Sequence, residues 1–471
     1  MYIHPRSITH KVFDAWRSPG RFTKNPDIIR LKTGRLLLVY SDTEAHWGET
    51  TQILTILYSD DDGKTWDKLS EVATSDRSKG DERLVTPRIS LLSDDRIAVI
   101  CDHDDFSHFH EDQTPGNWIW WSTDDGKTWD GPHRPNIMGF EPDRIIELPD
   151  GRLAVGTHIM LRESQEFAEI MTTSTDGGKT WGNQVIVANN GYHRFCEGAI
   201  VILDNGREIA CVMRENQSGG IPSFVTFSQD NGQTWSHPQM CGALIINNKP
   251  ERECRYSLLP PQDRFSTVDF EAELKVDGPS GEPVAFMSCG SIGQILYIGS
   301  DFITLGSIRT DLHKKIDFTQ PRKIAYRHNG GLLRIQVDGE DLIYRNVFRG
   351  EIGISDFSSS RPDMRTMFGQ WGEKGTSTWT KVNFSSKNRT LEDWSWSWTA
   401  ASGDYPDQYQ RDRLLQIHGN HPDQKPRPDH GYSSWLTLPD GRIIFVDYTN
   451  YGDEAGKSHI VGVHIDPEDI K

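Results

Sequence analysis

The octapeptide Ser59-Asp-Asp-Asp-Gly-Lys-Thr-Trp66 decides the fold, because the same pattern occurs three more times in the chain. The pattern is Ser-x-Asp-x-Gly-x-Thr-Trp, and the serines of successive copies lie 63, 52 and 54 residues apart. Its aspartate can accept backbone N–H groups within a tight turn, and its glycine can supply a positive φ. Each copy therefore predicts a hairpin turn whose tryptophan packs between neighbouring units. The other copies are Ser122-Thr-Asp-Asp-Gly-Lys-Thr-Trp129, Ser174-Thr-Asp-Gly-Gly-Lys-Thr-Trp181 and Ser228-Gln-Asp-Asn-Gly-Gln-Thr-Trp235.

A second repeat precedes each octapeptide and consists of an apolar strand, a polar turn that ends in arginine, and another apolar strand. With the octapeptide hairpin, each unit holds four antiparallel strands in about 50 residues, which is typical of a β-propeller blade. The copies of this second repeat cover residues 28–40, 89–100, 145–155, 200–210 and 435–446.

These two repeats resemble those of the Asp-box proteins, also called bacterial neuraminidase repeat proteins, of the sialidase superfamily. The resemblance covers about residues 20–250 and 430–465. It implies an all-β fold, a six-bladed β-propeller. The octapeptide is specific for this group of folds and says little about activity, because non-catalytic propellers also carry it.

Residues 265–398 lack the octapeptide, although strand-like alternation continues through them. The run Leu333-Arg-Ile-Gln-Val-Asp-Gly-Glu-Asp-Leu-Ile343 predicts a hairpin with a Val-Asp-Gly turn. This part looks like a laminin-G or concanavalin-like jelly roll inserted into the propeller, which splits blade five. The predicted domains are the propeller with blades one to four and the start of blade five (1–262), the inserted jelly roll (263–400) and the rest of the propeller (401–471).

Composition narrows the class of partner. The 471 residues carry a formal net charge of −17, so a nucleic-acid partner is not expected. No apolar run is long enough to span a membrane, and no secretory signal opens the chain, so we expect a cytoplasmic protein. The family resemblance implies a carbohydrate partner. The six cysteines form no CxxC motif and are expected to be buried free thiols, and no cofactor is predicted.

A propeller presents its ligand at the end where inner strands begin and second strands end. The repeat register places polar or ionisable side chains at nearly all of these positions, whereas the strand interiors are apolar. The pattern therefore predicts a ring of charges over one central pocket. The ring positions are Lys24, Asn25, Thr86, Arg88, Glu141, Asp143, Arg144, Glu197 and Tyr432 at strand starts, and Asp42, Asp102, His103, His158, Arg214 and Tyr448 at strand ends.

Within this ring, Glu197, Arg214 and Tyr432 match positions of the sialidase family. The resemblance implies that Tyr432 is the nucleophile, that Glu197 is its base and that Arg214 binds a substrate carboxylate. A phenol with a pKa of about 10 needs a neighbouring carboxylate to take its proton before it attacks an anomeric carbon. A neutral nucleophile also avoids repulsion by an anionic sugar.

The chain departs from the family at the first blade. Sialidases have Phe-Arg-Ile-Pro there, with the first of three carboxylate-binding arginines, and this chain has Thr23-Lys-Asn-Pro26. Lys24 keeps the charge but loses the bidentate geometry of arginine. The third arginine stays open between Arg255, Arg411 and Arg413.

The general acid is expected on the loop Ser41-Asp-Thr-Glu-Ala-His-Trp-Gly-Glu49, where Asp42, Glu44, His46 and Glu49 are open and Asp42 is preferred. The remaining predicted substrate-binding residues are Lys24, Arg88, His103, Glu141, Arg144 and His158, together with Arg214.

The segment Asp102-His-Asp-Asp-Phe-Ser-His-Phe-His110 is rich in metal-binding side chains. Its spacing matches no zinc pattern, so a substrate-binding loop is preferred and no metal is predicted.

Three functions remain open from the sequence. The leading hypothesis is a sialidase-like exo-glycoside hydrolase that removes a terminal, anionic sugar by a retaining Tyr/Glu mechanism. The alternatives are a polysaccharide lyase, in which Tyr432, His103 or His158 abstracts a proton from a uronate, and a non-catalytic glycan-binding propeller. The inserted domain is expected either to bind sugar or to form an oligomer contact.

Overall fold

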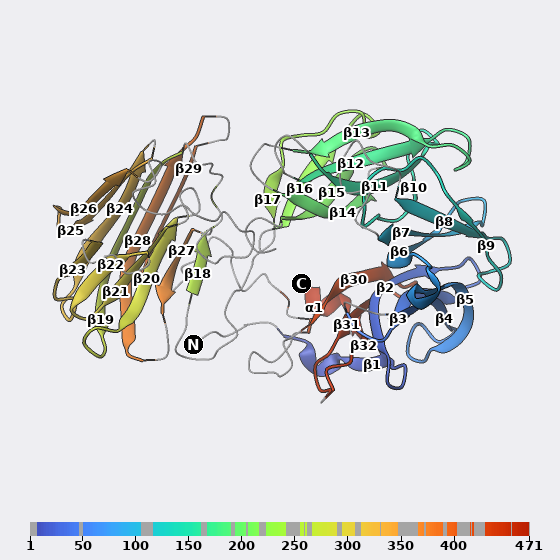
Figure 1. The fold of residues 1–471 in the computed structure, drawn as a ribbon, viewed down its shortest axis with the longest axis horizontal. Helices are drawn as coiled ribbons and strands as arrows, with labels where there is room; N and C mark the ends of the chain where they lie inside the picture. The colour runs from blue at the N-terminus through green and yellow to red at the C-terminus, as the bar shows by residue number, and fades with distance from the viewer. Residues whose placement is uncertain are drawn as a thin grey trace. The chain divides into compact units, whose positions relative to one another are not determined.

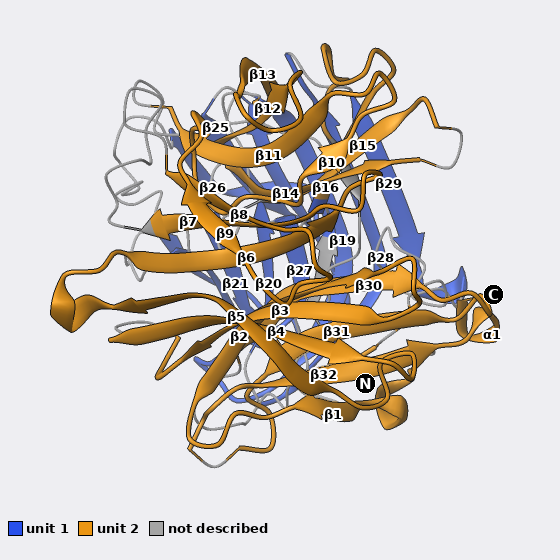
Figure 2. Ribbon diagram, turned by 90° about the vertical axis from the view of Figure 1, so that its right-hand side faces the viewer, with its two compact units in different colours: residues 1–5, 215–223, 240–414 blue, residues 6–214, 224–239, 415–471 orange. Residues whose placement is uncertain are grey.

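The computed structural model consists of two compact units built from antiparallel strands (Figures 1 and 2). Unit 1 comprises residues 1–5, 215–223 and 240–414, and unit 2 comprises residues 6–214, 224–239 and 415–471. The all-β prediction is confirmed, because the one α-helix in the described residues is α1 (Pro467–Ile470). In those same residues, no helix is long and apolar enough to cross a membrane. The structure describes residues 7–46, 50–104, 116–161, 167–189, 194–203, 206–215, 223–241, 255–258, 260, 266–289, 294–306, 312–329, 331–346, 366–371, 374–389, 393–402, 415, 417–418, 429–453 and 455–470.

In the described residues, five four-stranded sheets form blades of the propeller, and Figure 1 shows the first strands β2, β6, β14 and β30 toward its middle. The last blade is closed by the first strand of the chain, because β1 (Phe13–Trp16) pairs with β32 (His459–Ile465). The other strands of this closing blade are β30 (His430–Thr437) and β31 (Ile443–Thr449). The four preceding blades are β2 (Phe22–Arg30), β3 (Leu36–Thr43), β4 (Thr51–Ser59) and β5 (Asp67–Asp76); β6 (Arg83–Leu91), β7 (Ile97–Asp104), β8 (Asn117–Ser122) and β9 (Asp130–His133); β10 (Ile146–Glu147), β11 (Leu153–Met160), β12 (Phe167–Ser174) and β13 (Gly182–Ala188); and β14 (Phe195–Ile202), β15 (Ile209–Glu215), β16 (Ser223–Ser228) and β17 (Gln239–Cys241).

The predicted fifth blade, split around the insert, falls largely outside the described residues, so the count of six stays a prediction. One strand near it differs from the prediction: β18 (Arg255–Leu258), expected in the propeller, pairs with β27 (Thr366–Gln370) of unit 1. The expected domain boundary at residue 263 therefore lies too late, because the backbone hydrogen bonds of β18 attach it to a sheet of the insert.

The octapeptides form the hairpin turns that the sequence predicts. Ser59 Oγ accepts from Gly63 N at 2.9 Å, and Asp61 Oδ1 accepts from Thr65 N at 2.9 Å. Gly63 has φ +82°, and Trp66 Nε1 donates to its carbonyl at 3.0 Å. Since the side chains of the turn satisfy its backbone N–H groups, the octapeptide is a structural motif.

Trp66 lies between its own blade and the closing blade, in one apolar cluster with Leu57 and Ile444. Trp181 likewise packs with residues of its own blade and of the blade before it, Val155 and Ile100 among them. The predicted packing of these tryptophans between units is therefore observed.

The arginine of the second repeat also joins neighbouring blades. Arg96 Nη1 donates to the carbonyl of Gly177 at 2.9 Å, and Arg152 Nη2 donates to that of Asn231 at 2.8 Å. Each acceptor lies in the octapeptide of the following blade, which explains why the two repeats occur together.

Unit 1 has two six-stranded antiparallel sheets around one apolar core, the two-layer arrangement that a jelly roll requires. The predicted Val-Asp-Gly turn joins two of its strands, with positive φ at Asp338 and Gly339. One sheet has the order β18, β27, β20 (Pro283–Cys289), β21 (Gln294–Gly299), β22 (Phe302–Leu305) and β23 (His313–Lys315). The other has the order β26 (Glu340–Asn346), β25 (Leu332–Val337), β24 (Arg322–Asn329), β19 (Thr267–Asp277), β28 (Thr376–Lys387) and β29 (Trp394–Thr399).

Replacement of Trp66 by alanine tests the packing between blades. Trp66 is 6% exposed, so Trp66→Ala is expected to lower the free energy of unfolding by about 3–5 kcal/mol through cavity formation. The matched control is Trp435→Ala on β30, whose side chain is 61% exposed and is expected to matter by less than about 0.5 kcal/mol. Urea denaturation measures both changes, and equal losses would contradict the role of Trp66.

Candidate functional site

In each described blade, a non-glycine residue with positive φ lies near the start of the first strand or, in the case of Glu141, shortly before it. In β2, Lys24 pairs with Ser41 and Asp27 pairs with Val39. The two β2 residues between these pairs oppose a single residue of β3 and form a bulge. The same two-against-one register occurs between β6 and β7 and between β30 and β31. A left-handed conformation costs an L-residue about 1–2 kcal/mol, so the surrounding fold must impose it. The residues and their φ values are Asn25 (55°), Thr86 (54°), Glu141 (49°), Glu197 (50°) and Tyr432 (52°).

Three residues predicted from the family resemblance come together at the ends of these strands. Tyr432 Oη on β30 donates to Glu197 Oε1 on β14 at 2.9 Å. Arg214 Nη1 on β15 donates to both oxygens of the same carboxylate, at 2.8 and 3.0 Å. The Glu197 carboxylate therefore lies between a phenol and a guanidinium, although Tyr432 is 235 residues away in the chain.

His158 contacts two glutamates of the site, Glu197 and Glu141. Its Nδ1 accepts from the backbone N–H of Glu197 at 3.3 Å, so the ring proton lies on Nε2, which faces Glu141 Oε2 at 3.5 Å. Burial lowers the pKa of His158 to about 3, so the imidazole is neutral near pH 7. The histidine can thus donate a hydrogen bond to Glu141 without adding charge.

The two glutamates of the site differ in their tendency to hold a proton. Burial, followed by the charges of Glu197 and Asp102, raises the pKa of Glu141 well above its usual value. Burial also opposes ionisation of Glu197, but the charge and hydrogen bonds of Arg214 outweigh it and lower the pKa of Glu197. Two carboxyls whose environments drive their pKa values apart can divide the roles of acid and base.

The phenol of Tyr432 is held neutral between these carboxyls. Burial, then the charges of Glu141 and Glu197, raise the pKa of Tyr432 well above its ordinary value. The Arg88 guanidinium carbon lies 5.1 Å from the centroid of the Tyr432 ring and opposes this shift. In the part of the chain that the structure describes, Arg88 forms no direct ion pair with a carboxylate, although its charge opposes the effect of burial and acts to lower the pKa of Asp27 and Asp143 from a longer distance.

Two other predicted substrate-binding cations hold the protein itself together. Arg144 Nη2 donates to Asp27 Oδ1 at 2.5 Å and to Ser434 Oγ at 2.6 Å, which links three blades. Lys24 is 3% exposed, and its Nζ donates to the carbonyl of His46 at 2.8 Å. Their predicted contact with substrate remains a prediction.

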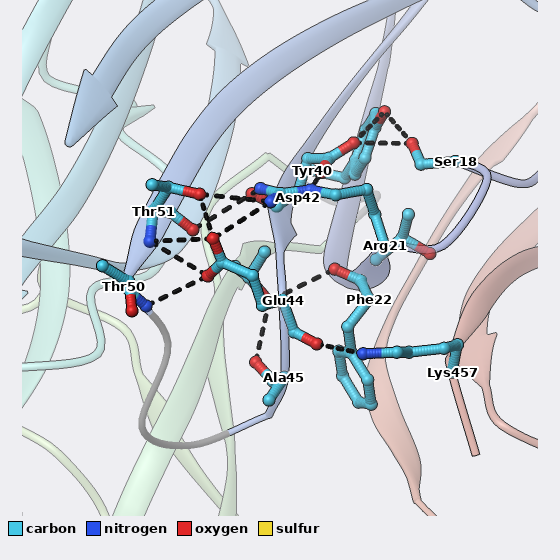
Figure 3. Close-up of polar contacts among 12 residues, drawn as sticks. Ser18, Arg21, Phe22, Tyr40, Asp42, Glu44, Ala45, Thr50, Thr51 and Lys457 are labelled. Atoms are coloured by element: carbon cyan, nitrogen blue, oxygen red, sulfur yellow. Dashed lines mark hydrogen bonds and ion pairs between the residues drawn. The ribbon is translucent and has the colours of Figure 1, made fainter. Parts of the chain in front are cut away.

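The loop expected to carry the acid is anchored by hydrogen bonds, as Figure 3 shows. Asp42 accepts from Arg21 Nε at 2.5 Å and from Ser18 Oγ at 2.6 Å. Glu44 accepts from Thr51 N at 2.9 Å. Although burial acts in the opposite direction, hydrogen bonds from Thr51 and its neighbour lower the pKa of Glu44 to about 2. Glu44 is thus unsuited to donate a proton near pH 7.

These contacts assign Asp42 an anchoring role through Arg21 and Ser18 and give no support to it as the acid. Lys457 Nζ donates to the carbonyl of Glu44, which fastens the same loop to the closing blade (Figure 3). Among the other candidates, His46 Nδ1 lies 2.7 Å from Asp429 Oδ2. Glu49 lies outside the described residues, as do Arg411, Arg413 and the side chain of Arg255.

His103 is placed with side chains of its own blade. Its Nδ1 lies 2.7 Å from Glu82 Oε2, and its ring stacks on Trp118 with centroids 4.7 Å apart. Residues 105–110 of the histidine-rich segment lie outside the described residues, so its role as a binding loop stays a prediction.

Glu169 was not predicted from the sequence and lies fully buried behind Glu197. Its Oε2 accepts from Gly198 N at 3.3 Å, whereas Oε1 has no hydrogen-bond partner in the described structure. A side chain at Gly198 would meet this carboxyl, because an added Cβ would lie 2.5 Å from it. The signal in the sequence was a glutamate within the apolar strand Phe167-Ala-Glu-Ile-Met171.

Replacement of Glu169 by glutamine tests the cost of this burial. Burial, then the charge of Asp143, raises the pKa of Glu169 well above its usual value. Below pH 4 the folded and unfolded states both hold the proton, whereas at higher pH the unfolded state alone releases it. The free energy of unfolding therefore falls by up to about 1.4 kcal/mol per unit of rising pH, until the pH reaches the pKa of Glu169 in the folded state. Glu169→Gln is expected to remove this slope between pH 4.5 and 8 in thermal melts. Parallel pH profiles of the two proteins would contradict the assignment.

Solved structures of low sequence identity align with most of this chain. A crystal structure of a protein of unknown function from Dyadobacter fermentans aligns with a TM-score of 0.50 and 14% identity, over 97% of this chain and 98% of that one. The α-L-arabinofuranosidase Arb93A of Fusarium graminearum, in complex with an iminosugar inhibitor, aligns with a TM-score of 0.45 and 13% identity, over 98% and 99% of the two chains.

Sequence comparison identifies the repeats. Residues 106–251 match the family model of the BNR repeat-like domain. A sialidase of Paraclostridium sordellii is 27% identical over 119 residues, which are 21% of this chain and 30% of the relative, so less than a third of that protein is matched. Together with the four octapeptides and the blade topology, these matches support the resemblance to the sialidase-type BNR-repeat superfamily.

Proposed function

We propose that this protein is a retaining exo-glycoside hydrolase whose nucleophile is Tyr432 and whose base is Glu197. The observation that carries the proposal is the 2.9 Å hydrogen bond from Tyr432 Oη to Glu197 Oε1, with Arg214 bound to the same carboxylate. The partial match to a sialidase supports a glycoside hydrolase.

In the first step, Tyr432 Oη attacks the anomeric carbon while its proton moves to Glu197 Oε1. Arg214 keeps Glu197 ionised beforehand, so that the carboxylate can accept this proton. The bond to the leaving oxygen breaks, and that oxygen takes a proton from a general acid. Water then attacks the glycosyl-tyrosine carbon and gives a proton to the conjugate base of the acid. The bond from this carbon to Tyr432 Oη breaks, and Tyr432 regains its proton from Glu197. Because the carbon is attacked twice, each time with inversion, the anomeric configuration is retained.

We assign the general acid to Glu141 in place of Asp42. Its raised pKa keeps a proton on the carboxyl near pH 7, which a general acid needs. His158 Nε2 lies 3.5 Å from Glu141 Oε2 and can orient that carboxyl.

An anionic substrate is supported by the cations at the rim of this group. Arg88 lies against the Tyr432 ring, and Arg214 is partly exposed while it holds Glu197. A guanidinium recognises a carboxylate through two parallel hydrogen bonds, so Arg88 is the side chain that we assign to the acidic group of the sugar.

Replacement of Tyr432 by phenylalanine tests the nucleophile. Tyr432→Phe keeps the ring beside Arg88 and is expected to reduce kcat at least about a thousandfold on aryl glycosides, nonulosonic acid glycosides included. Mass spectrometry of the wild type with a slow fluorinated substrate should locate the glycosyl group on Tyr432. Label on Glu197 would reassign the nucleophile, and an unsaturated, ultraviolet-absorbing product would indicate a lyase.

Glu141→Gln tests the acid through the leaving group. The variant is expected to lose at least about a hundredfold in kcat on alkyl glycosides, whose leaving oxygen needs a proton, and little on nitrophenyl glycosides. It should also lose the alkaline limb of the pH profile, because that limb reports deprotonation of the acid. Asp42→Asn is the matched comparison, and the same pattern in that variant alone would return the role to Asp42.

A further inference from the structure

A second group of ionisable side chains lies in the closing blade, away from the catalytic roles assigned above. His418, His430 and Asp447 come from three segments of the chain, and one ligand atom from each lies within 4.8 Å of the other two. His430 begins β30, Asp447 lies in β31, and His418 lies in the segment that precedes β30. All three belong to unit 2.

Asp447 is oriented by the backbone around it. Its Oδ1 accepts from Tyr448 N at 2.7 Å and from Gly431 N at 3.1 Å. These bonds direct Oδ2 toward His418 Nε2, which lies 2.7 Å away. Both side chains are almost fully buried, at 5% and 10% exposure. An oriented carboxylate beside an imidazole is the arrangement that outer hydrogen bonds give to metal ligands.

His430 completes the group from the solvent side. Its ring centroid lies 5.7 Å from that of His418, and the two rings are nearly perpendicular. In the described residues its side chain makes no hydrogen bond, so a ring nitrogen is open to a ligand. Tetrahedral ligands at about 2.0–2.1 Å from zinc lie about 3.4 Å apart, so a modest rotation of this exposed side chain closes the group.

We propose that His418, His430 and Asp447 bind a Zn²⁺ ion, with water as the fourth ligand. Two imidazoles and one carboxylate match the donors that zinc prefers, whereas Ca²⁺ and Mg²⁺ favour sites made of oxygen alone. The sequence did not indicate this site, because its ligands are separated by 11 and 16 intervening residues and form no short motif.

The ion ties the segment that contains His418 to β30 and β31. Tyr432 follows His430 by two residues on β30, so the ion fixes the start of the strand that carries the positive-φ tyrosine. The role is structural, and it does not depend on the proposed hydrolase activity.

The experiment compares zinc binding by the full chain and two variants. Protein stripped with a chelator is dialysed against micromolar ZnCl₂, and bound zinc is measured by mass spectrometry and by isothermal titration. The wild type is expected to hold one equivalent more than His430→Ala and to gain thermal stability on zinc addition. The variant is expected to bind at least about tenfold more weakly, since loss of even an outer partner weakens metal binding about 10–100-fold.

His133→Ala is the matched control, because His133 also pairs with an aspartate, Asp130, at 3.0 Å but is exposed and, among the described residues, belongs to no three-residue group. It should bind zinc like the wild type. Cobalt(II) provides a second readout, since visible bands of four-coordinate cobalt should appear in the wild type and not in His430→Ala.

Equal zinc content in the wild type and a folded His430→Ala would overturn the proposal. An equal loss of zinc in His133→Ala would also overturn it. So would a gain in thermal stability on addition of CaCl₂ that is lost in His430→Ala. His430 is exposed, so its variant is expected to fold, and its melting curve without metal checks that directly.

Discussion

The two-against-one bulge at the start of the inner strands is the constraint on which the site depends. Its register occurs where Asn25, Thr86 and Tyr432 have positive φ, and Glu141 and Glu197 have the same φ near the starts of their strands. A left-handed conformation costs each residue about 1–2 kcal/mol. In the first blades a proline follows the positive-φ residue, as in Asn25-Pro26 and Thr86-Pro87, and proline has no N–H to leave unpaired in a bulge. The bulge redirects each side chain, which a regular strand would alternate between the two faces of the sheet.

Hydrogen bonds between blades offset this strain. Residues two positions after a positive-φ residue accept from the backbone of the next inner strand: Asp27 from Ile89 N at 2.8 Å and Asp143 from Ile200 N at 2.7 Å. Arg144 then balances the charge of the buried Asp27. Removal of one partner from such a buried pair costs about 3–5 kcal/mol, because the other charge is left without compensation. Some charged residues of the ring thus bind neighbouring blades to one another, and others face the site.

The sequence predicted the features that repeat and missed those that depend on distant partners. The octapeptides predicted the hairpins, and the register brought Glu197, Arg214 and Tyr432 to one place. The register could not tell which ring charges pair internally, because the partner of Arg144 is 117 residues away. The raised pKa of Glu141 likewise follows from burial beside Glu197 and Asp102, which no linear spacing encodes.

The electrostatics of the site explain why a phenol suits it as the proposed nucleophile. Glu197 and Asp102 lie close enough to a buried glutamic acid to raise its pKa, so further negative charge there is costly. Transfer of the Tyr432 proton to Glu197 moves the existing charge by one hydrogen bond and adds none. Tyr432 oxygen loses that charge as it bonds to carbon, and the charge then developing on the leaving oxygen is neutralised by the proton on Glu141. At no point do two ionised carboxylates have to face each other around the phenol, and Arg214 has only one carboxylate to balance before attack.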